Sequence, residues 1–305
     1  MKKLLLLAFM VLFSCQESKK ETKSSHSNLE LQSDSLQNVP QEPYYVDIKR
    51  NDLKLEKPVY GEWRFFNKEK GQSFNQFIKT KHVVPTKEEN IIYLKPIGKF
   101  NALQLKQIEL VRQYLQIFFQ LETAILPGVS NDIIPNNARR KGSMEQEQFL
   151  AGYILREVLK KEKPKKGVAL MAVTEKDLYP KPEWSYVFGL ASYKDKIAVS
   201  SMYRMQKEAD FNLCLERLLK ICSHEIGHMF GLHHCVEAHC VMNGTNSMSE
   251  TDNHSIRLCS LCQRKLNSGF KYDNLKRLKE LEKYFKENNL TEGLQLMERD
   301  LKSIQ

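Results

Sequence analysis

The sequence predicts an α/β (α+β) fold with a mixed, twisted sheet, one long central helix and a helical C-terminal extension. Short runs rich in β-branched residues alternate with segments whose apolar residues recur at helical spacing, as expected when helices cover a sheet. The segment 273–305 shows helical spacing alone. With 305 residues and 41% hydrophobic content, the chain is long enough for one enzyme-sized core plus extensions.

Two apolar runs and their accompanying helices predict the first part of the sheet. The run "IIYLKPIGKF" (91–100) favours a strand because it is rich in β-branched and aromatic residues. A first helix is predicted by apolar residues at helical spacing, namely Leu105, Ile108, Val111, Leu115 and Phe118. A second helix is predicted over Gln148–Lys161, and the run "VALMAVTE" (168–175) predicts the next strand.

Two further apolar runs predict a hairpin at a sheet edge. They are "WSYVFGLASY" (184–193) and "KIAVSSMYR" (196–204), and the polar residues Lys194 and Asp195 lie between them. Such a short polar connection suits two antiparallel strands. An exposed edge strand in this position could matter for substrate binding.

The longest predicted helix begins at Phe211, with Asp210 as its N-cap and Gly231 as its stop. Its buried stripe consists of Leu215, Leu218, Cys222, Ile226 and Met229. Two amphipathic helices follow near the C-terminus and separate near Asn288 and Asn289. Their apolar stripes are Leu275, Leu278, Leu281 and Phe285, and then Leu294, Met297 and Leu301.

The N-terminus has the layout of a secretory signal. Met1-Lys2-Lys3 precedes an apolar run (4–13) that is about half the roughly 20 residues a helix needs to cross a bilayer. The run ends in Leu12-Phe13-Ser14-Cys15, which resembles the lipobox of bacterial lipoproteins. We therefore expect lipidation of Cys15 and a lipid-anchored location in the bacterial cell envelope, periplasmic or surface-facing. The alternative is an ordinary signal peptide that happens to contain a cysteine.

Four parts of the chain are distinguished by composition: a signal peptide (1–15), a flexible tether (16–58), a catalytic domain (59–272) and a helical C-terminal extension (273–305). The tether is expected because residues 16–43 contain no aromatic residue and are dominated by Ser, Lys, Glu and Gln. The net charge of +10 does not indicate nucleic-acid binding, because the lysines form no basic stripe with interleaved aromatic residues.

The segment "HEIGH" places His224 and His228 four residues apart on one helical face, where two imidazoles can share a metal. Gly231 allows the chain to turn sharply away from the helix, so that His234 can return as a third ligand. The register counted from Gly231 favours His234 over its neighbour His233.

Three neutral imidazoles around Zn²⁺ leave a fourth position for water, whose pKa falls to about 7 on zinc. Glu225 lies beside the ligands, where it would take a proton from this zinc-bound water and pass it to the leaving amine. The pattern therefore predicts a zinc-dependent metallopeptidase with Glu225 as its catalytic residue. Its substrate would be a peptide or protein.

Two pairs of cysteines follow the histidines: Cys235 with Cys240, and Cys259 with Cys262. Pairs of thiolates at such spacings suit a tetrahedral structural zinc. In an exported chain, however, an even number of cysteines ordinarily forms disulfides. The spacing favours zinc, and two disulfides remain the alternative.

The segments "HEIGHMFGLHHCVEAHCVM" (224–242) and "CSLC" (259–262) together resemble the archaemetzincin family of zinc metallopeptidases, in the metzincin clan. The resemblance continues in "DLYP" (177–180), "YVFGLASY" (186–193) and "AVSS" (198–201) with Arg204. It implies a metzincin-like domain with two Zn²⁺ ions, one catalytic and one structural. It also implies that Met242 is the Met-turn residue and that substrate lies beside the edge strand Tyr186–Tyr193.

One departure from the family pattern concerns location, since its members are often intracellular and this chain carries an export signal. A second function therefore stays open beside the peptidase. It is a zinc-stabilised, peptide-binding envelope lipoprotein with little or no proteolytic activity. The intact His-Glu-x-x-His pattern favours the enzyme.

Overall fold

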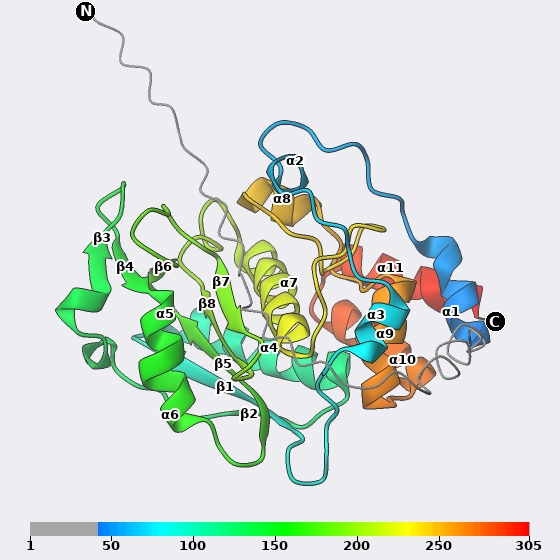
Figure 1. Ribbon diagram of the computed structural model, residues 1–305, viewed down its shortest axis with the longest axis horizontal. Coiled ribbons are helices and arrows are strands. Elements are labelled where there is room, and N and C mark those ends of the chain that lie inside the picture. Colours follow the sequence, from blue (N-terminus) through cyan, green and yellow to red (C-terminus); the bar gives the residue numbers. More distant parts are fainter. Residues whose placement is uncertain (1–41, 305) are drawn as a thin grey trace, which may run out of the picture. The chain divides into compact units, whose positions relative to one another are not determined.

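The main sheet is built around β5 (Gly167–Thr174), in which every residue is buried. In this computed structural model, which describes residues 42–304, the strand order is β2-β1-β5-β8-β7 (Figure 1). Strands β1 (Ile91–Ile97), β2 (Thr123–Ile125), β5 and β8 (Ile197–Ser201) are parallel, and β7 (Gly189–Ser192) pairs antiparallel to β8 at one edge. The predicted mixed sheet, its strands at β1 and β5, and the edge hairpin are confirmed.

Helices cover both faces of this sheet, because successive side chains of a strand point to opposite sides. Met171 and Val173 of β5 pack with α4 (Ala102–Phe119) and α7 (Phe211–Met229). Leu170 and Ala172 pack on the other face, against the helical segment that begins with α5 (Ala151–Tyr153). A strand buried on both faces has a continuous apolar sequence, which is why β5 was recognisable.

The predicted helix Gln148–Lys161 is wrong at its start. Residues Glu147–Leu150 form strand β4, in a second sheet with β3 (Arg139–Lys141) and β6 (Asp177–Tyr179). The helix begins only at α5 and continues through the π-helical η5 (Ile154–Leu159) and α6 (Lys160–Glu162). Gln148 is held in the strand by hydrogen bonds to Asp177 Oδ2 and the Ser185 carbonyl, both at 2.8 Å. These partners are distant in sequence, so helical spacing gave no sign of them.

The other predicted helices are present. Asp210 caps α7 as expected, with its Oδ1 accepting from the Leu213 amide at 2.8 Å. The C-terminal helices are α10 (Asn274–Glu287) and α11 (Thr291–Ser303), and Asn289 between them has a φ of 54°. Shorter helices are α2 (Trp63–Phe66), α3 (Phe74–Lys79), η3 (Asn131–Ile133), η4 (Asn136–Ala138), α8 (Met248–Asn253) and α9 (Ser260–Phe270).

The predicted tether, 16–58, extends too far into the folded part. Residues Pro43–Ile48 form α1, followed by η2 (Lys49–Asn51), and the side chains of Tyr45 and Ile48 are buried. This segment is fastened to the C-terminal half by Arg257, whose guanidinium contacts Asp52 Oδ1 at 2.6 Å and Asp300 Oδ2 at 2.7 Å. A buried arginine must be paired, and these two carboxylates satisfy it.

The C-terminal extension shares its core with the predicted catalytic domain. Leu278 and Phe285 of α10 belong to the same apolar cluster as Tyr114 of α4. Arg277 is buried and donates to the Phe118 carbonyl oxygen at 2.6 Å. Within residues 42–304 no helix is both long and apolar enough to span a membrane. The predicted signal peptide, the lipidated Cys15 and the first part of the tether lie outside the described residues.

Candidate active site

The three predicted histidines converge at the C-terminal end of α7. His224 and His228 lie one turn apart with ring centroids 4.4 Å from each other. After the helix, Gly231 has a φ of 94° and the chain reverses, which brings the His234 ring to 5.3 Å from His224 and 4.9 Å from His228. The possible ligand atoms of the three lie within 4.8 Å of one another. His234, rather than His233, completes this group, as the register predicted.

Each imidazole of this group has a hydrogen-bond acceptor at its Nδ1 atom. The pairs are His224 with the Val241 carbonyl oxygen at 2.8 Å, His228 with the Leu232 carbonyl oxygen at 2.7 Å, and His234 with Glu69 Oε1 at 2.9 Å. Carbonyl and carboxylate oxygens can only accept, so Nδ1 carries the proton and the Nε2 lone pair is left free. This tautomer is the one that a metal ligand needs.

The histidine group fits zinc by the chemistry of its donors. Burial, with a contribution from the neighbouring His234, lowers the pKa of His224 to about 3. Burial also lowers the pKa of His228 well below its usual value. Both imidazoles are therefore neutral near pH 7, which is the form that binds a metal. Three imidazole nitrogens around one point are a known catalytic zinc set.

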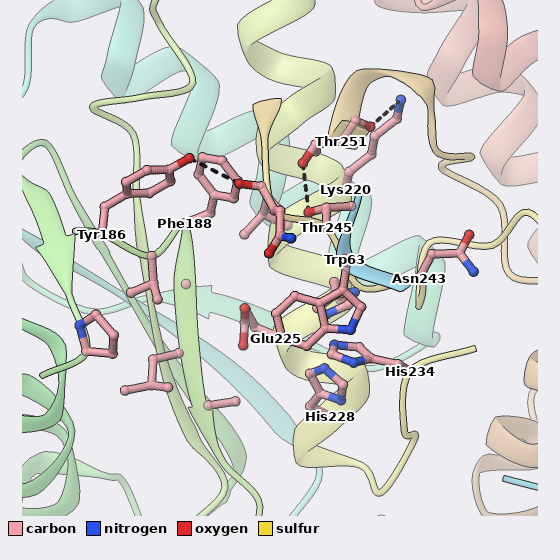
Figure 2. A pocket seen from close by; sticks show the side chains of 18 of the residues that line it. Trp63, Tyr186, Phe188, Lys220, Glu225, His228, His234, Asn243, Thr245 and Thr251 are labelled. Carbon is pink, nitrogen blue, oxygen red and sulfur yellow. Dashed lines mark hydrogen bonds between the residues drawn. The ribbon is translucent and has the colours of Figure 1, made fainter. Parts of the chain in front are cut away.

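Glu225 lies beside the histidines and faces the same cavity (Figure 2). Burial raises the pKa of its carboxyl to about 8, so this group can both take up and release a proton near neutral pH. Gly189 of β7 provides the room for it. A Cβ added at Gly189 would lie 2.6 Å from Glu225 Oε1 and 2.9 Å from Cδ, closer than real contacts allow.

A cavity of about 720 Å³ opens in front of these groups. Its walls come from the segment 180–193, from α7 and from the chain between Val241 and Ser255. Tyr186 bridges two of these walls, because its hydroxyl donates to the Asn246 carbonyl oxygen at 3.1 Å (Figure 2). Gly189, Leu190 and Ala191 of the edge strand β7 border the cavity.

The buried carboxylate of Asp177 supports the cavity wall formed by residues 180–193. Asp177 is fully buried and is held by Arg204 through two hydrogen bonds of 2.9 and 2.8 Å. The guanidinium of Arg204 also stacks over the Tyr186 ring, with its Cζ 3.5 Å from the ring centroid. The "DLYP" segment and Arg204, which carried part of the family resemblance, thus fix the wall rather than take part in the chemistry.

Met242 packs directly against the turn of α7 between His224 and His228. Its sulfur would lie 2.5 Å from a Cβ added at Gly227, so this position has no room for a side chain. The residue before it, Val241, supplies the carbonyl that orients His224. Met242 therefore lies where a Met-turn residue is expected, beneath the histidine group.

The four predicted cysteines also converge. Their sulfur atoms lie within 4.8 Å of one another, and the pair Cys235–Cys259 is 3.7 Å apart. Zinc–sulfur bonds of about 2.3 Å in a tetrahedron place sulfurs roughly 3.8 Å apart, whereas a disulfide requires about 2.05 Å. Cys240 Sγ also accepts backbone N–H groups from Met242 and Cys259, at 3.5 and 3.3 Å. All four lie in one buried cluster whose sulfur spacing is consistent with zinc.

Residues that the sequence did not identify also reach the site. Trp63 borders the cavity, and its ring lies 5.1 Å from that of His234 (Figure 2). Glu69 contacts His234. Trp63 and Glu69 belong to no local motif, so only their positions in the folded chain connect them with the histidines. Tyr193, the last residue of the predicted edge strand, also reaches the site, where its hydroxyl lies 2.9 Å from His228 Nδ1.

Comparison with known proteins identifies the family. Residues 148–268 match Peptidase family M54. The archaemetzincin of Pyrococcus abyssi is 39% identical over 183 residues, which cover 58% of this chain and 94% of that protein. This chain belongs to the archaemetzincin family. Archaemetzincin-2 of Rattus norvegicus is 28% identical over 267 residues, covering 76% of this chain and 74% of that protein.

The predicted fold class and enzyme class are confirmed by the same comparisons. The crystal structure of archaemetzincin from Methanopyrus kandleri superimposes with a TM-score of 0.51 at 26% identity, covering 62% of this chain and 100% of that one. Like its family, this chain is a zinc-dependent metallopeptidase, a hydrolase that acts on peptide bonds. The alternative of a binding protein without activity is not favoured.

The close approach of Gly189 to Glu225 gives a first prediction. Gly189→Ala should lower kcat/KM by about 100-fold, because a carboxylate displaced by about 1 Å no longer meets its reaction partner. The zinc content and the midpoint of unfolding should change little, since only the end of a flexible side chain has to move. Steady-state kinetics with a peptide substrate, together with a metal count, measure both.

Gly128→Ala is the matched control, because a Cβ there would make only ordinary contacts at 3.6 Å. Wild-type activity of Gly189→Ala would show that Glu225 tolerates the shift, and the argument from close approach would then fail.

Proposed function

We propose that His224, His228 and His234 hold the catalytic zinc and that Glu225 transfers the proton in peptide hydrolysis. The observation that supports this best is the convergence of three free Nε2 atoms and one buried carboxyl on a single cavity. Zinc, when bound, supplies a Lewis acid that polarises a carbonyl group and makes water acidic enough to ionise near neutral pH.

Residues of this chain transfer the proton, orient the imidazoles and bind the substrate. Glu225 accepts the proton of the attacking water and then donates it to the leaving amine. The three Nδ1 hydrogen bonds keep the imidazoles in the metal-binding tautomer. The edge strand β7 pairs with the main chain of the substrate by β-augmentation. KM values for variants of β7 test that last step, and unchanged KM values would remove it.

Glu225→Gln tests the role of the carboxyl. The amide has the same size but cannot take up a proton, so we expect kcat to fall by about 10²–10⁴-fold while the zinc content stays at the wild-type level. Glu157→Gln, at an exposed position on η5, is the control and should keep full activity. Undiminished turnover by Glu225→Gln would exclude this residue as the base.

We further propose two Zn²⁺ ions per chain, the second held by Cys235, Cys240, Cys259 and Cys262 as a structural site. A metal count combined with thiol titration of the purified protein tests this. We expect two zinc ions and no disulfide, with the four thiols becoming reactive only after unfolding and chelation. Cys262→Ser should leave one zinc and a much less stable protein. One zinc with four oxidised cysteines would contradict the structural site.

The location of the protein in the cell is a separate proposal that rests on the sequence of residues 12–15. We propose that Cys15 is acylated and anchors the enzyme to a membrane of the bacterial cell envelope. In bacteria that process lipoproteins, the wild-type chain should partition into the membrane fraction, and Cys15→Ser should not. Equal partitioning of the two chains would remove the anchor without affecting the active site.

A further inference from the structure

A segment from the N-terminal part of the chain crosses the active site, and we call residues 59–72 the strap. It contains α2, which lies next to α8 (Figure 1). The strap lies outside residues 148–268, which match the peptidase family. Its Trp63 borders the substrate cavity, close to His234 (Figure 2). The strap therefore belongs to the walls of the site although it is remote from the histidine motif in the sequence.

One end of the strap is fastened at Trp63. The Trp63 amide donates to both carboxylate oxygens of Glu250, at 3.0 and 3.2 Å. The same carboxylate accepts from the Asn246 amide at 2.7 Å, which ties the strap to the cavity wall. Gly244 leaves room for the indole, since a Cβ there would lie 2.5 Å from Trp63 Cδ1. The position of the indole is thus fixed by close packing and by hydrogen bonds.

The other end of the strap is held by hydrogen bonds to the turn of the chain that follows α7. Gln72 is buried, and its Nε2 donates to the Gly231 carbonyl oxygen at 3.1 Å. The His233 amide donates to Gln72 Oε1 at 3.4 Å. Gly71 lies so close to Val236 that a Cβ there would be 2.6 Å from its Cγ2. The strap is therefore packed along the segment that carries His234.

Glu69 lies between these two ends. It accepts from His234 Nδ1, with Oε1 at 2.9 Å and Oε2 at 3.1 Å, and from the Trp63 indole N–H at 3.2 Å. His224 and His228 are oriented by backbone carbonyls within seventeen residues of them in the sequence. His234 instead depends on a carboxylate 165 residues away in the chain. The third ligand is thus the one whose orientation is supplied by a distant side chain.

We propose that Glu69 is a positioning residue that holds His234 in its zinc-binding tautomer and orientation, and that the strap is therefore part of the metal site. This inference rests on the proposed function, in which His234 is a zinc ligand. A negatively charged acceptor forms a stronger hydrogen bond than a neutral carbonyl and makes the opposite nitrogen a better donor to a metal. Trp63 contributes by donating to Glu69 and by packing against the His234 ring.

The zinc affinity of the histidine site tests this proposal independently of activity. Purified full-length protein is titrated with a chelator of known affinity, and zinc loss is followed while thiol titration reports that the cysteine site stays loaded. Glu69→Ala should weaken zinc binding at the histidine site by about 10–100-fold. Glu69→Gln should fall between Glu69→Ala and wild type, because its amide oxygen still accepts the hydrogen bond without a charge. Such a graded series would not arise from a general loosening of the strap.

Glu56→Gln is the matched control. Glu56 also lies in the N-terminal part and makes a carboxylate–histidine contact of the same kind, Oε2 to His239 Nε2 at 2.8 Å, but His239 is not in the histidine group. This variant should bind zinc like the wild type at the histidine site.

His234→Ala gives the lowest zinc affinity expected at the histidine site. It also distinguishes an error in the role of Glu69 from an error in the proposed ligand set. If it loses zinc from the histidine site while both Glu69 variants keep wild-type affinity, the role of Glu69 is wrong and the ligand set stands. If His234→Ala itself keeps wild-type affinity, the proposed ligand set is wrong, and the inference about Glu69 falls with it.

Discussion

The reversal of the chain at Gly231 is the constraint on which the histidine group and the cysteine group both depend. Gly231 has a φ of 94°, in the left-handed region that residues with a Cβ rarely adopt. A Cβ there would also approach His82 Cβ to 3.1 Å. Directly after this turn the chain places His234 beside the histidines of α7 and Cys235 in the thiol cluster. The Cys235 amide then donates to the Met242 carbonyl oxygen at 2.8 Å, which closes the loop.

Because His234 and Cys235 are consecutive, the two groups share one short piece of backbone. The thiol cluster is buried, with Cys240, Cys259 and Cys262 each at most 1% exposed. A metal held there would fix the backbone of Cys235 and, through one peptide bond, the position of His234. A loaded cysteine group would thus support the histidine group by covalent continuity, in addition to the contacts that the strap makes with His234.

Buried polar contacts hold one wall of the site and also fasten the N-terminal segment, and they connect parts of the chain that are far apart in sequence. Asp177 joins β6 to Arg204 and to Gln148 of β4, which fixes the wall beside β7. Arg257 joins α11, through Asp300, to the segment after η2, through Asp52. Buried charges are costly unless fully paired, so these contacts hold together the elements that they join.

The sequence by itself determined the features that follow from local spacing. The interval between His224 and His228, the turn at Gly231 and the cysteine pairs were enough to predict which histidines and cysteines converge, because each depends on neighbours along one helix or loop. The apolar periodicity of α7 and the continuous apolar run of β5 were recognisable for the same reason.

The tertiary structure alone decided the rest. Gln148 had the spacing of a helix but lies in β4, because Asp177 and Ser185 hold it there. The tether was predicted over residues 16–58 from the composition of residues 16–43. Beyond Pro43, the apolar side chains of Tyr45 and Ile48 are buried in the fold. Glu69 reaches His234 across 165 positions. Contacts of this kind leave no periodicity in the sequence, since what selects them is the meeting of distant surfaces once the helices and strands have packed.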